Sequence, residues 1–316
     1  MSGPILGLHH VTAIARDPQQ NVDFYTKALG LRLVKRTVNF DSPETYHLYF
    51  GDEQGRPGTI MTFFPWPMAA RGSRGAGQAA VTSFSVPPGS LPAWQRRLRD
   101  LGVVVEQPYE RFDEEVLTIL DPDGLMLELV AHEDVAEQPG WPQGPVDETE
   151  AIRGFHSVTL WQQGYEATAE LLTDGMGFRQ THSADNRFRF EVGDGGLGTL
   201  VDVLCVPDAS YGRISAGTVH HVAWRAADDA DQAAWRERLS GRGLNVTPVL
   251  DRNYFRSIYF REPGGVLFEL ATDPPGFTAD EPVETLGTEL KLPSWLEPRR
   301  QRIEGALPPL VVDSKG

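Results

Sequence analysis

Hydrophobic and polar positions repeat in one order four times along the chain. Each repeat begins with a short apolar run, continues with an amphipathic helical pattern that stops near a glycine, and ends in three further apolar runs. The helical pattern around residues 22–25, for example, stops at Gly30, as helices often do. The four repeats begin near Leu8, Ala79, Gly154 and Thr218. The pattern predicts four βαβββ modules.

The chain also divides into segments of different composition. Residues 132–152 are rich in Glu, Asp, Pro and Gly and predict a linker between the second and third modules. We therefore expect an N-terminal pair of modules over 1–135, a linker over 136–152, and a C-terminal pair over 153–272. Prolines and scattered apolar residues in 273–316 predict a C-terminal arm packed on the body, not a free tail.

Composition and charge narrow the class of protein. The 316 residues are 40% hydrophobic and 23% charged, which is ordinary for a globular protein of two domains. The formal net charge of -15 disfavours nucleic acid and membrane surfaces as partners. The single cysteine, Cys205, cannot form an internal disulfide, and the sequence has no signal-peptide or membrane-span pattern. We therefore expect a cytoplasmic protein.

Two histidine pairs and one acid are candidate metal ligands. His9 and His10 open the first module, His220 and His221 open the fourth, and Glu269 lies in the last apolar strand of the fourth. Successive side chains of a strand point to opposite faces, so we expect only one histidine of each pair to reach a shared metal. Two imidazoles and one carboxylate suit Fe(II) or Mn(II) with open coordination positions. For any one histidine alone, a satisfied core residue is the alternative.

Comparison of the modules selects between the two histidines of each pair. One column of aligned first-strand positions is followed two residues later by valine, and it holds His9, His156 and His220. The other column is followed by threonine or alanine, and it holds His10, Ser157 and His221. Valine is typical of a packed face, and small or polar residues suit a cavity. The comparison therefore predicts His10, His221 and Glu269 as the ligands.

Glu128 shows what a buried acid means without partner histidines. It occupies the position of Glu269 at the end of the second module, within a similar apolar run. A carboxylate among apolar neighbours is costly to bury unless it binds a cation or hydrogen-bond donors. The third module carries Ser157, a poor ligand, where the first carries His10. We therefore expect Glu128 to be a leftover or a structural counterpart of Glu269, and no second metal site.

Short sequence motifs within residues 7–65 and 292–304 add to the repeated modules and the candidate ligands. They read Gly-Leu-His-His-Val-Thr at 7–12, Tyr-His-Leu-Tyr-Phe-Gly-Asp at 46–52, Pro-Gly-Thr at 57–59, Phe-Phe-Pro at 63–65, and Leu-Pro, Trp-Leu-Glu and Arg-Ile-Glu within 292–304. With the repeated modules, they resemble the vicinal-oxygen-chelate superfamily, which includes glyoxalase I, fosfomycin-resistance proteins, bleomycin-binding proteins and extradiol dioxygenases. Within it, the chain resembles the four-module, hydroquinone-type ring-cleaving dioxygenases.

The resemblance implies an α+β fold in which four βαβββ modules pair into two domains with half-barrel mixed sheets. It implies one metal, Fe(II) or alternatively Mn(II), between the first and last modules, in agreement with His10, His221 and Glu269. It also implies that Arg252 and Tyr259 lie near the substrate, where Arg252 could hold an anionic oxygen and Tyr259 could donate a hydrogen bond or a proton. Without the resemblance, a surface arginine and a core tyrosine would be the simpler interpretation.

Three further residues are candidates around the metal. His9 and His220, adjacent to the predicted ligands, are candidate outer-sphere catalytic groups, although an extended strand would turn them away from the metal. Thr12 shares the strand face of His10 and is a candidate substrate contact. His47, in an alternating strand, has no assigned role.

These observations predict an Fe(II)-dependent, extradiol-type dioxygenase that opens a hydroquinone or related dihydroxylated aromatic ring with O2. Phe63, Phe64 and Trp66 are candidate walls for such a ring, although aromatic runs at a strand end are more typical of a core. A glyoxalase-like isomerase or lyase that uses Zn(II), Ni(II) or Mn(II) is one alternative. A non-catalytic protein that binds an aromatic ligand is another, but it would not need three metal ligands. A homo-oligomer is compatible with the sequence, which does not indicate its order.

Overall fold

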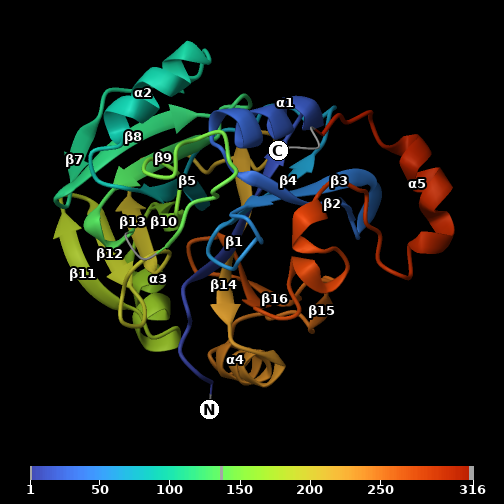
Figure 1. The fold of residues 1–316 in the computed structure, drawn as a ribbon. Helices are drawn as coiled ribbons and strands as arrows, with labels where there is room; N and C mark the ends of the chain where they lie inside the picture. The colour runs from blue at the N-terminus through green and yellow to red at the C-terminus, as the bar shows by residue number, and fades with distance from the viewer. Residues whose placement is uncertain (1, 136–137, 313–316) are drawn as a thin grey trace.

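Each of the first two modules consists of a strand, a helix and three or more further strands (Figure 1). The computed structural model describes residues 2–135 and 138–312. The first module contains β1 (Leu8–Ala15), α1 (Pro18–Asp23) continued by a π-helical turn (Phe24–Ala28), β2 (Arg32–Asn39), β3 (Ser42–Gly51) and β4 (Ile60–Pro65). The second contains β5 (Gln78–Val86), α2 (Leu91–Asp100), β6 (Val104–Val105), β7 (Tyr109–Arg111), β8 (Glu114–Leu120) and β9 (Met126–Ala131), followed by a 3-10 turn (Glu133–Val135).

The third and fourth modules repeat this order. The third contains β10 (Gly154–Gln162), α3 (Glu166–Glu170) continued by a π-helical turn (Leu171–Gly175), β11 (Arg179–Ala184), β12 (Arg187–Glu191) and β13 (Leu200–Cys205). The fourth contains β14 (Thr218–Ala226), α4 (Asp229–Gly241), β15 (Leu250–Asp251), β16 (Arg256–Arg261) and β17 (Leu267–Thr272). The arm that follows contains 3-10 turns (Phe277–Ala279, Val283–Thr285 and Glu297–Arg299) and α5 (Arg300–Ala306). No helix of the described residues is long and apolar enough to cross a membrane.

The two sheets combine modules from opposite halves of the chain. The first runs in the order β15-β16-β17-β14-β1-β4-β3-β2 and joins the fourth module to the first; we call it the outer-module sheet. The second runs in the order β11-β12-β13-β10-β5-β9-β8-β6, with β7 paired to β8, and joins the third module to the second; we call it the inner-module sheet. The predicted α+β class with curled, mixed sheets is confirmed. Both sheets cross the domain boundaries expected along the chain, and these boundaries stay a prediction.

The modules of each sheet meet along an antiparallel pair of first strands that β-bulges interrupt. In the outer-module sheet, the paired positions of β1 and β14 skip His9 and His220. In the inner-module sheet, the paired positions of β10 and β5 skip His156 and Ala80. A bulge sets two residues opposite one and changes the direction of their side chains. The bulges therefore fall on the residues that precede the predicted ligands and on their inner-sheet counterparts.

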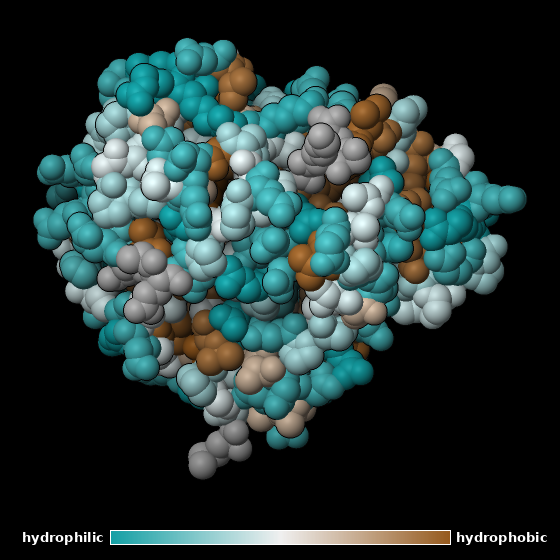
Figure 2. Space-filling view, viewed as in Figure 1, coloured by the Kyte–Doolittle hydropathy of each residue, from teal (hydrophilic) through white to brown (hydrophobic). Residues whose placement is uncertain are grey.

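The hydrophobic core lies on the helix-covered side of the sheets. Val11, Val158 and Val222 are fully buried there, in one cluster with helix residues such as Trp94. Because side chains alternate along a strand, His10 points to the opposite side of β1. Val11, Val158 and Val222 thus lie on the packed face, as predicted, but His9 and His220 of the same column contact the predicted ligands instead. The molecular face in Figure 2 is mostly hydrophilic, with hydrophobic residues in small separate areas.

The C-terminal arm packs against the first module. Many of its apolar side chains are buried, namely Phe277, Leu286, Leu292, Leu296, Ile303 and Leu307, whereas Trp295 is 49% exposed. Lys35 on β2 is fully buried and binds the carboxylates of Asp280, at 2.6 Å, and Glu281. The backbone of Arg36 pairs with that of Leu290. The arm therefore covers β2, an edge strand whose backbone would otherwise be open to another chain.

Candidate metal centre

Three side chains from neighbouring strands converge on one side of the outer-module sheet. His10 on β1, His221 on β14 and Glu269 on β17 each place a ligand atom within 4.8 Å of the others. The Nε2 atoms of the two histidines are 3.2 Å apart, and Glu269 Oε2 lies 3.4 Å from that of His10 and 3.0 Å from that of His221. All three residues are buried. The structure therefore brings together the three residues that the sequence predicts as ligands.

The donor atoms have the chemistry of a metal site. Glu269 Oε2 is buried and has no hydrogen-bond partner among the described residues, although both imidazoles approach it. Burial acts to raise the pKa of Glu269, but His10 and His221 outweigh burial and hold this pKa well below its usual value. Burial, partly opposed by Glu269, lowers the pKa of His221. A carboxylate and neutral imidazoles are the ligating forms, so the site fits a divalent cation such as Fe(II) or Mn(II).

Ser257 on β16 orients the carboxylate of this group. Its hydroxyl donates a hydrogen bond to Glu269 Oε1, which leaves Oε2 for the histidine side. Hydrogen bonds of this kind fix the direction of a ligand and tune its basicity. The sequence analysis missed Ser257. The available signal was its position two residues before Tyr259, on the same face of a strand.

The histidines that precede the ligands contact them directly. His9 Nδ1 lies 2.9 Å from His10 Nδ1, and His220 Nδ1 lies 2.8 Å from His221 Nδ1. These contacts leave the Nε2 atom of each predicted ligand directed toward Glu269. A regular strand would turn adjacent side chains apart, as we expected from the sequence. The bulges at His9 and His220 explain the difference, because they re-aim the side chains.

These two supporting histidines differ in their access to the cavity. His220 lines the cavity described below, whereas His9 is 2% exposed and packs against the ring of Phe255. Burial, and then the neighbouring His221, lower the pKa of His220 to about 3. Burial, and then His10, lower the pKa of His9 well below its usual value. Both rings are therefore neutral at physiological pH.

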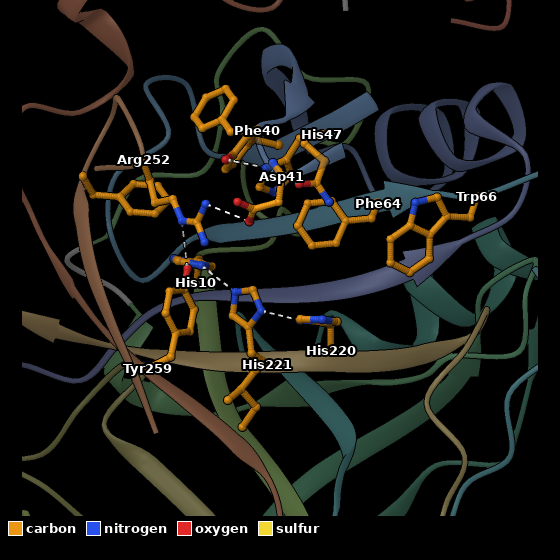
Figure 3. A pocket seen from close by; sticks show the side chains of 14 residues that line it. His10, Phe40, Asp41, His47, Phe64, Trp66, His220, His221, Arg252 and Tyr259 are labelled. Carbon is orange, nitrogen blue, oxygen red and sulfur yellow. Dashed lines mark hydrogen bonds and ion pairs between the residues drawn. The ribbon is translucent and has the colours of Figure 1, made fainter. Parts of the chain in front are cut away.

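A cavity of about 320 Å³ opens over the two histidine ligands (Figure 3). Its apolar and aromatic lining comprises Phe40, Tyr49, Phe64, Trp66, Phe255, Tyr259 and Leu267. Its polar lining comprises His10, Asn39, Asp41, His47, His220, His221 and Arg252. Of the three aromatic residues considered as walls, Phe64 and Trp66 line the cavity, and Phe63 belongs to the core. Apolar walls with a few polar groups are typical of a small-molecule site.

Arg252 and Tyr259 lie together at one side of this cavity (Figure 3). Arg252 Nε is 3.3 Å from Tyr259 Oη, and Arg252 Nη1 is 3.0 Å from Asp41 Oδ2. Burial, and then Glu269, raise the pKa of Tyr259, so this side chain stays a protonated phenol. Burial acts to lower the pKa of Arg252, but Tyr259 and Asp41 outweigh it and keep the guanidinium charged. Both residues thus reach the cavity in forms that suit their predicted roles.

Thr12 lies on the predicted strand face but not on the cavity surface. It is fully buried, and its hydroxyl is 2.9 Å from that of Thr62 on β4. Thr62 in turn lies 2.8 Å from His47 Nε2. The structure therefore connects Thr12 to the cavity through Thr62 and His47. The sequence analysis left His47 without a role and did not consider Tyr49 for the cavity, because an alternating strand alone carries no signal of a site.

The inner-module sheet has a different arrangement at the matching place. Arg111 binds both carboxylate oxygens of Glu128, at 2.9 and 2.8 Å. Ser157 Oγ lies 3.0 Å from His156 Nδ1. The group formed by His10, His221 and Glu269 is the cluster of metal-ligating side chains found within 2–135 and 138–312. This geometry agrees with a structural role for Glu128.

Comparisons with known proteins agree with this geometry. Residues 7–129 and 154–270 match the family described as "Glyoxalase/Bleomycin resistance protein/Dioxygenase superfamily". A protein of Bacillus subtilis (strain 168) named "Putative ring-cleaving dioxygenase MhqO" is 48% identical over 315 residues, which cover 99% of this chain and 99% of that protein. A Sphingobium indicum protein named "Chlorohydroquinone/hydroquinone 1,2-dioxygenase" is 38% identical over 297 residues, or 92% of each chain.

A solved structure agrees with these sequence relatives. The crystal structure of a protein from Bacillus subtilis, described as a "putative dioxygenase", superposes with a TM-score of 0.94 at 47% identity and covers 99% of both chains. The family match extends over most of this chain and includes all three residues of the candidate centre. The chain belongs to the glyoxalase, bleomycin resistance protein and dioxygenase superfamily.

Proposed function

We propose that the protein is an Fe(II)-dependent, extradiol-type dioxygenase that opens the ring of a hydroquinone or related dihydroxylated aromatic with O2; Mn(II) is the alternative metal. The observation that carries the proposal is the convergence of His10 Nε2, His221 Nε2 and Glu269 Oε2 beneath an aromatic-walled cavity. The names of two relatives support the reaction class, since one contains "ring-cleaving dioxygenase" and the other "hydroquinone 1,2-dioxygenase".

The chemistry divides between the metal and the chain. His10, His221 and Glu269 would hold Fe(II), and the metal would supply the redox chemistry between an electron-rich ring and O2. His9 and His220 hold the ligand rings in orientation. Tyr259, a neutral phenol, is placed to donate a hydrogen bond or a proton, and Arg252 is placed to hold an anionic oxygen. The aromatic walls provide an apolar surface for a ring beside these groups.

Two alternatives use the same fold. A glyoxalase-like isomerase or lyase would use Zn(II), Ni(II) or Mn(II) on the same ligands as a Lewis acid. A non-catalytic protein would bind an aromatic ligand in the cavity without need of the three converging donors. The aromatic lining together with a complete ligand set favours the dioxygenase.

Oxygen consumption tests the proposal. The protein is reconstituted with Fe(II) without air, mixed with hydroquinones or catechols, and exposed to O2 while oxygen uptake and ring-product absorbance are recorded. We expect uptake in proportion to the ring consumed, and none from a Glu269→Gln variant. If no dihydroxylated ring causes uptake and the protein instead holds zinc or nickel tightly, the isomerase takes the place of the dioxygenase.

Substitution of single histidines tests the choice of ligands. His221→Ala removes one of the three converging donors and should abolish iron binding. His156→Ala is the matched control, because His156 binds Glu114 in the inner-module sheet at 2.8 Å and should leave the iron content unchanged. Equal losses of iron in the two variants would contradict the assignment. Iron content is measured after desalting of the reconstituted proteins.

A further inference from the structure

A hydroquinone presents the proposed site with a problem that a catechol does not. Its two hydroxyl groups lie on opposite sides of the ring, so only one of them can bind the metal, whereas both oxygens of a catechol can bind together. Discrimination in favour of a polar group requires a matching polar group in the site. The following inference rests on the proposed function and identifies the side chain that takes the second oxygen.

Four side chains form a hydrogen-bonded row from the metal centre to the cavity wall. Thr12 lies opposite His221 in the β1 and β14 pair, and its hydroxyl is 2.9 Å from that of Thr62. Thr62 Oγ1 is 2.8 Å from His47 Nε2, and His47 Nδ1 is 2.8 Å from Tyr49 Oη. Both threonines are fully buried, whereas His47 and Tyr49 line the cavity. The row therefore ends at a phenol on the cavity wall.

The inner-module sheet carries charged residues at three of the four matching positions. The strand registers align Thr12 with Thr159, Thr62 with Asp202, His47 with Arg187, and Tyr49 with Arg189. Asp202 accepts hydrogen bonds from both arginines, at 2.9 and 2.8 Å, and Arg187 also donates to Thr159. Asp202 and these partners thus satisfy one another's hydrogen-bonding groups. The row in the outer-module sheet is neutral, and it keeps a polar end at the cavity.

Tyr49 has hydrogen-bonding capacity beyond its contact with His47. A phenol oxygen both donates and accepts, and a neutral imidazole can carry its proton on either nitrogen. When Tyr49 donates to His47 Nδ1, its oxygen can accept from a ligand hydroxyl. When His47 Nδ1 carries the proton, Tyr49 can donate to a ligand oxygen, and the threonine hydroxyls rotate to complete the row. Burial lowers the pKa of His47 and raises the pKa of Tyr49, so both side chains stay neutral.

The other polar groups of the cavity have partners or lie at its rim. Trp66 Nε1 donates to a threonine hydroxyl at 3.1 Å. Arg252 binds Asp41, whose side chain is 74% exposed. The ring of His47 is held in place by Phe64, with the two ring centres 4.4 Å apart. Tyr259 and His220 also keep hydrogen-bonding capacity, but both contact the predicted ligand His221. Tyr49 is the polar group with unused capacity on β3, where His47 orients it.

We propose that Tyr49, oriented by His47 and Thr62, binds the substrate oxygen that the metal does not bind and so selects para-dihydroxylated rings. Tyr49 contacts the substrate, whereas His47 and Thr62 are positioning residues that act through it. The inference concerns affinity and selectivity, so it can be measured without turnover.

Paired titrations test this subsite. The Fe(II)-loaded protein is titrated calorimetrically, without air, with hydroquinone and with phenol, which lacks the second hydroxyl. We expect the wild type to bind hydroquinone about fivefold more tightly than phenol, as one neutral hydrogen bond allows. Tyr49→Phe should lose this preference, apart from the advantage of about twofold that two equivalent hydroxyls give hydroquinone statistically. Tyr46→Phe is the matched control and should keep the preference, because the Tyr46 hydroxyl lies on the same strand but donates to Pro308 O in the arm.

The outcomes of these measurements test the Tyr49 subsite and the proposed function separately. A wild-type preference no greater than the statistical advantage, or a larger preference that survives Tyr49→Phe, overturns the subsite. If Tyr49→Phe does not fold, His47→Gln takes its place with the same expected loss of preference. Oxygen uptake by the wild type with hydroquinone is recorded in parallel. Uptake without a binding preference contradicts the subsite alone, and absence of uptake contradicts the proposed function.

Discussion

The outer-module and inner-module sheets share one architecture but differ at the positions of the candidate metal centre. The strand registers align His10 with Ser157, His221 with Val81, and Glu269 with Glu128. The inner-module sheet thus keeps the acid and lacks both imidazoles. Because a buried carboxylate needs a cation or hydrogen-bond donors, the acid that remains must find another partner.

Arg111 is that partner. It lies as many residues before Glu128 as Arg252 lies before Glu269. Both ends of its guanidinium bind Glu128, and the pair is buried. Arg252 instead turns toward the cavity rim and leaves Glu269 to the histidines. The comparison teaches that one strand position accommodates a buried acid in two ways, with a cation from the chain or with a site for a cation from solution.

Replacement of each acid by its amide should give the largest difference between the two sheets. Glu269→Gln removes the anionic ligand, and we expect iron retention and oxygen uptake to fall to background. Glu128→Gln should keep both in the folded fraction, because its partner is Arg111 and not a metal. Metal analysis and an oxygen electrode measure the two effects. Loss of iron from Glu128→Gln, with the fold retained, would contradict the division of roles.

Replacing each arginine should separate stability from activity. Arg111→Met leaves Glu128 buried without its cation, and we expect the free energy of unfolding to fall by about 3–5 kcal/mol. Arg252→Met breaks a pair whose acid, Asp41, is 74% exposed, so the same quantity should fall by less than about 1 kcal/mol. Turnover should nevertheless drop in Arg252→Met. Urea unfolding measures the two losses of stability, and oxygen uptake measures turnover. If Arg252 were the structural residue, Arg252→Met would lose more stability than Arg111→Met.

Acid should weaken the metal-free outer-module sheet first. Burial lowers the pKa of His220 from 6.5 to about 3, so the unfolded chain binds a proton that the folded chain excludes between these values. Stability is therefore full above pH 6.5 and falls toward pH 3, by at most about 1.4 kcal/mol per pH unit for each such histidine. In the inner-module sheet, His156 and Arg189 outweigh burial and lower the pKa of Glu114 from 4.5 to about 2. Its contribution is lost only below pH 4.5.

Urea unfolding of the metal-free protein between pH 7 and 5 measures this difference. We expect a decline in stability across that range and a shallower decline in His220→Gln, which lacks one of the excluded protons. A constant free energy of unfolding from pH 7 to 5 would show that the histidines of the outer-module sheet are protonated in the folded state.

Removing a serine beside each acid should give the smallest effects. Ser257→Ala removes the hydrogen bond to Glu269 Oε1, and we expect the iron affinity to fall about 10- to 100-fold with the site still formed. Ser83→Ala removes the 2.7 Å bond to Glu128 and should leave the iron affinity unchanged. Competition with a chelator measures both affinities. Equal affinities of Ser257→Ala and the wild type would remove Ser257 from the centre.

The modules and the convergence of the three candidate ligands could be predicted because both rest on repeats. The recurring apolar runs marked the βαβββ units, and the valine two residues after His9, His156 and His220 marked the packed face. Strand alternation then selected His10 and His221. The grouping of the first module with the fourth and of the second with the third in one sheet each was not predicted, because sheet order depends on contacts between distant segments of the chain.

Other features of the site leave no such signal. A bulge changes the direction of a side chain and not its residue type, so the contacts of His9 and His220 with the ligands could not be read from a regular strand. Arg111 reaches Glu128 through the pairing of β7 with β8, which the apolar pattern does not contain. Tyr49 alternates with core residues as in any half-buried strand.

The metal content of the reconstituted protein tests the central claim most directly. The wild type is loaded with Fe(II) under anaerobic conditions and desalted. Its iron is measured by inductively coupled plasma mass spectrometry and divided by the protein concentration. A single centre built by His10, His221 and Glu269 predicts one iron per chain. Two irons per chain, or none, would contradict a single metal centre in the outer-module sheet.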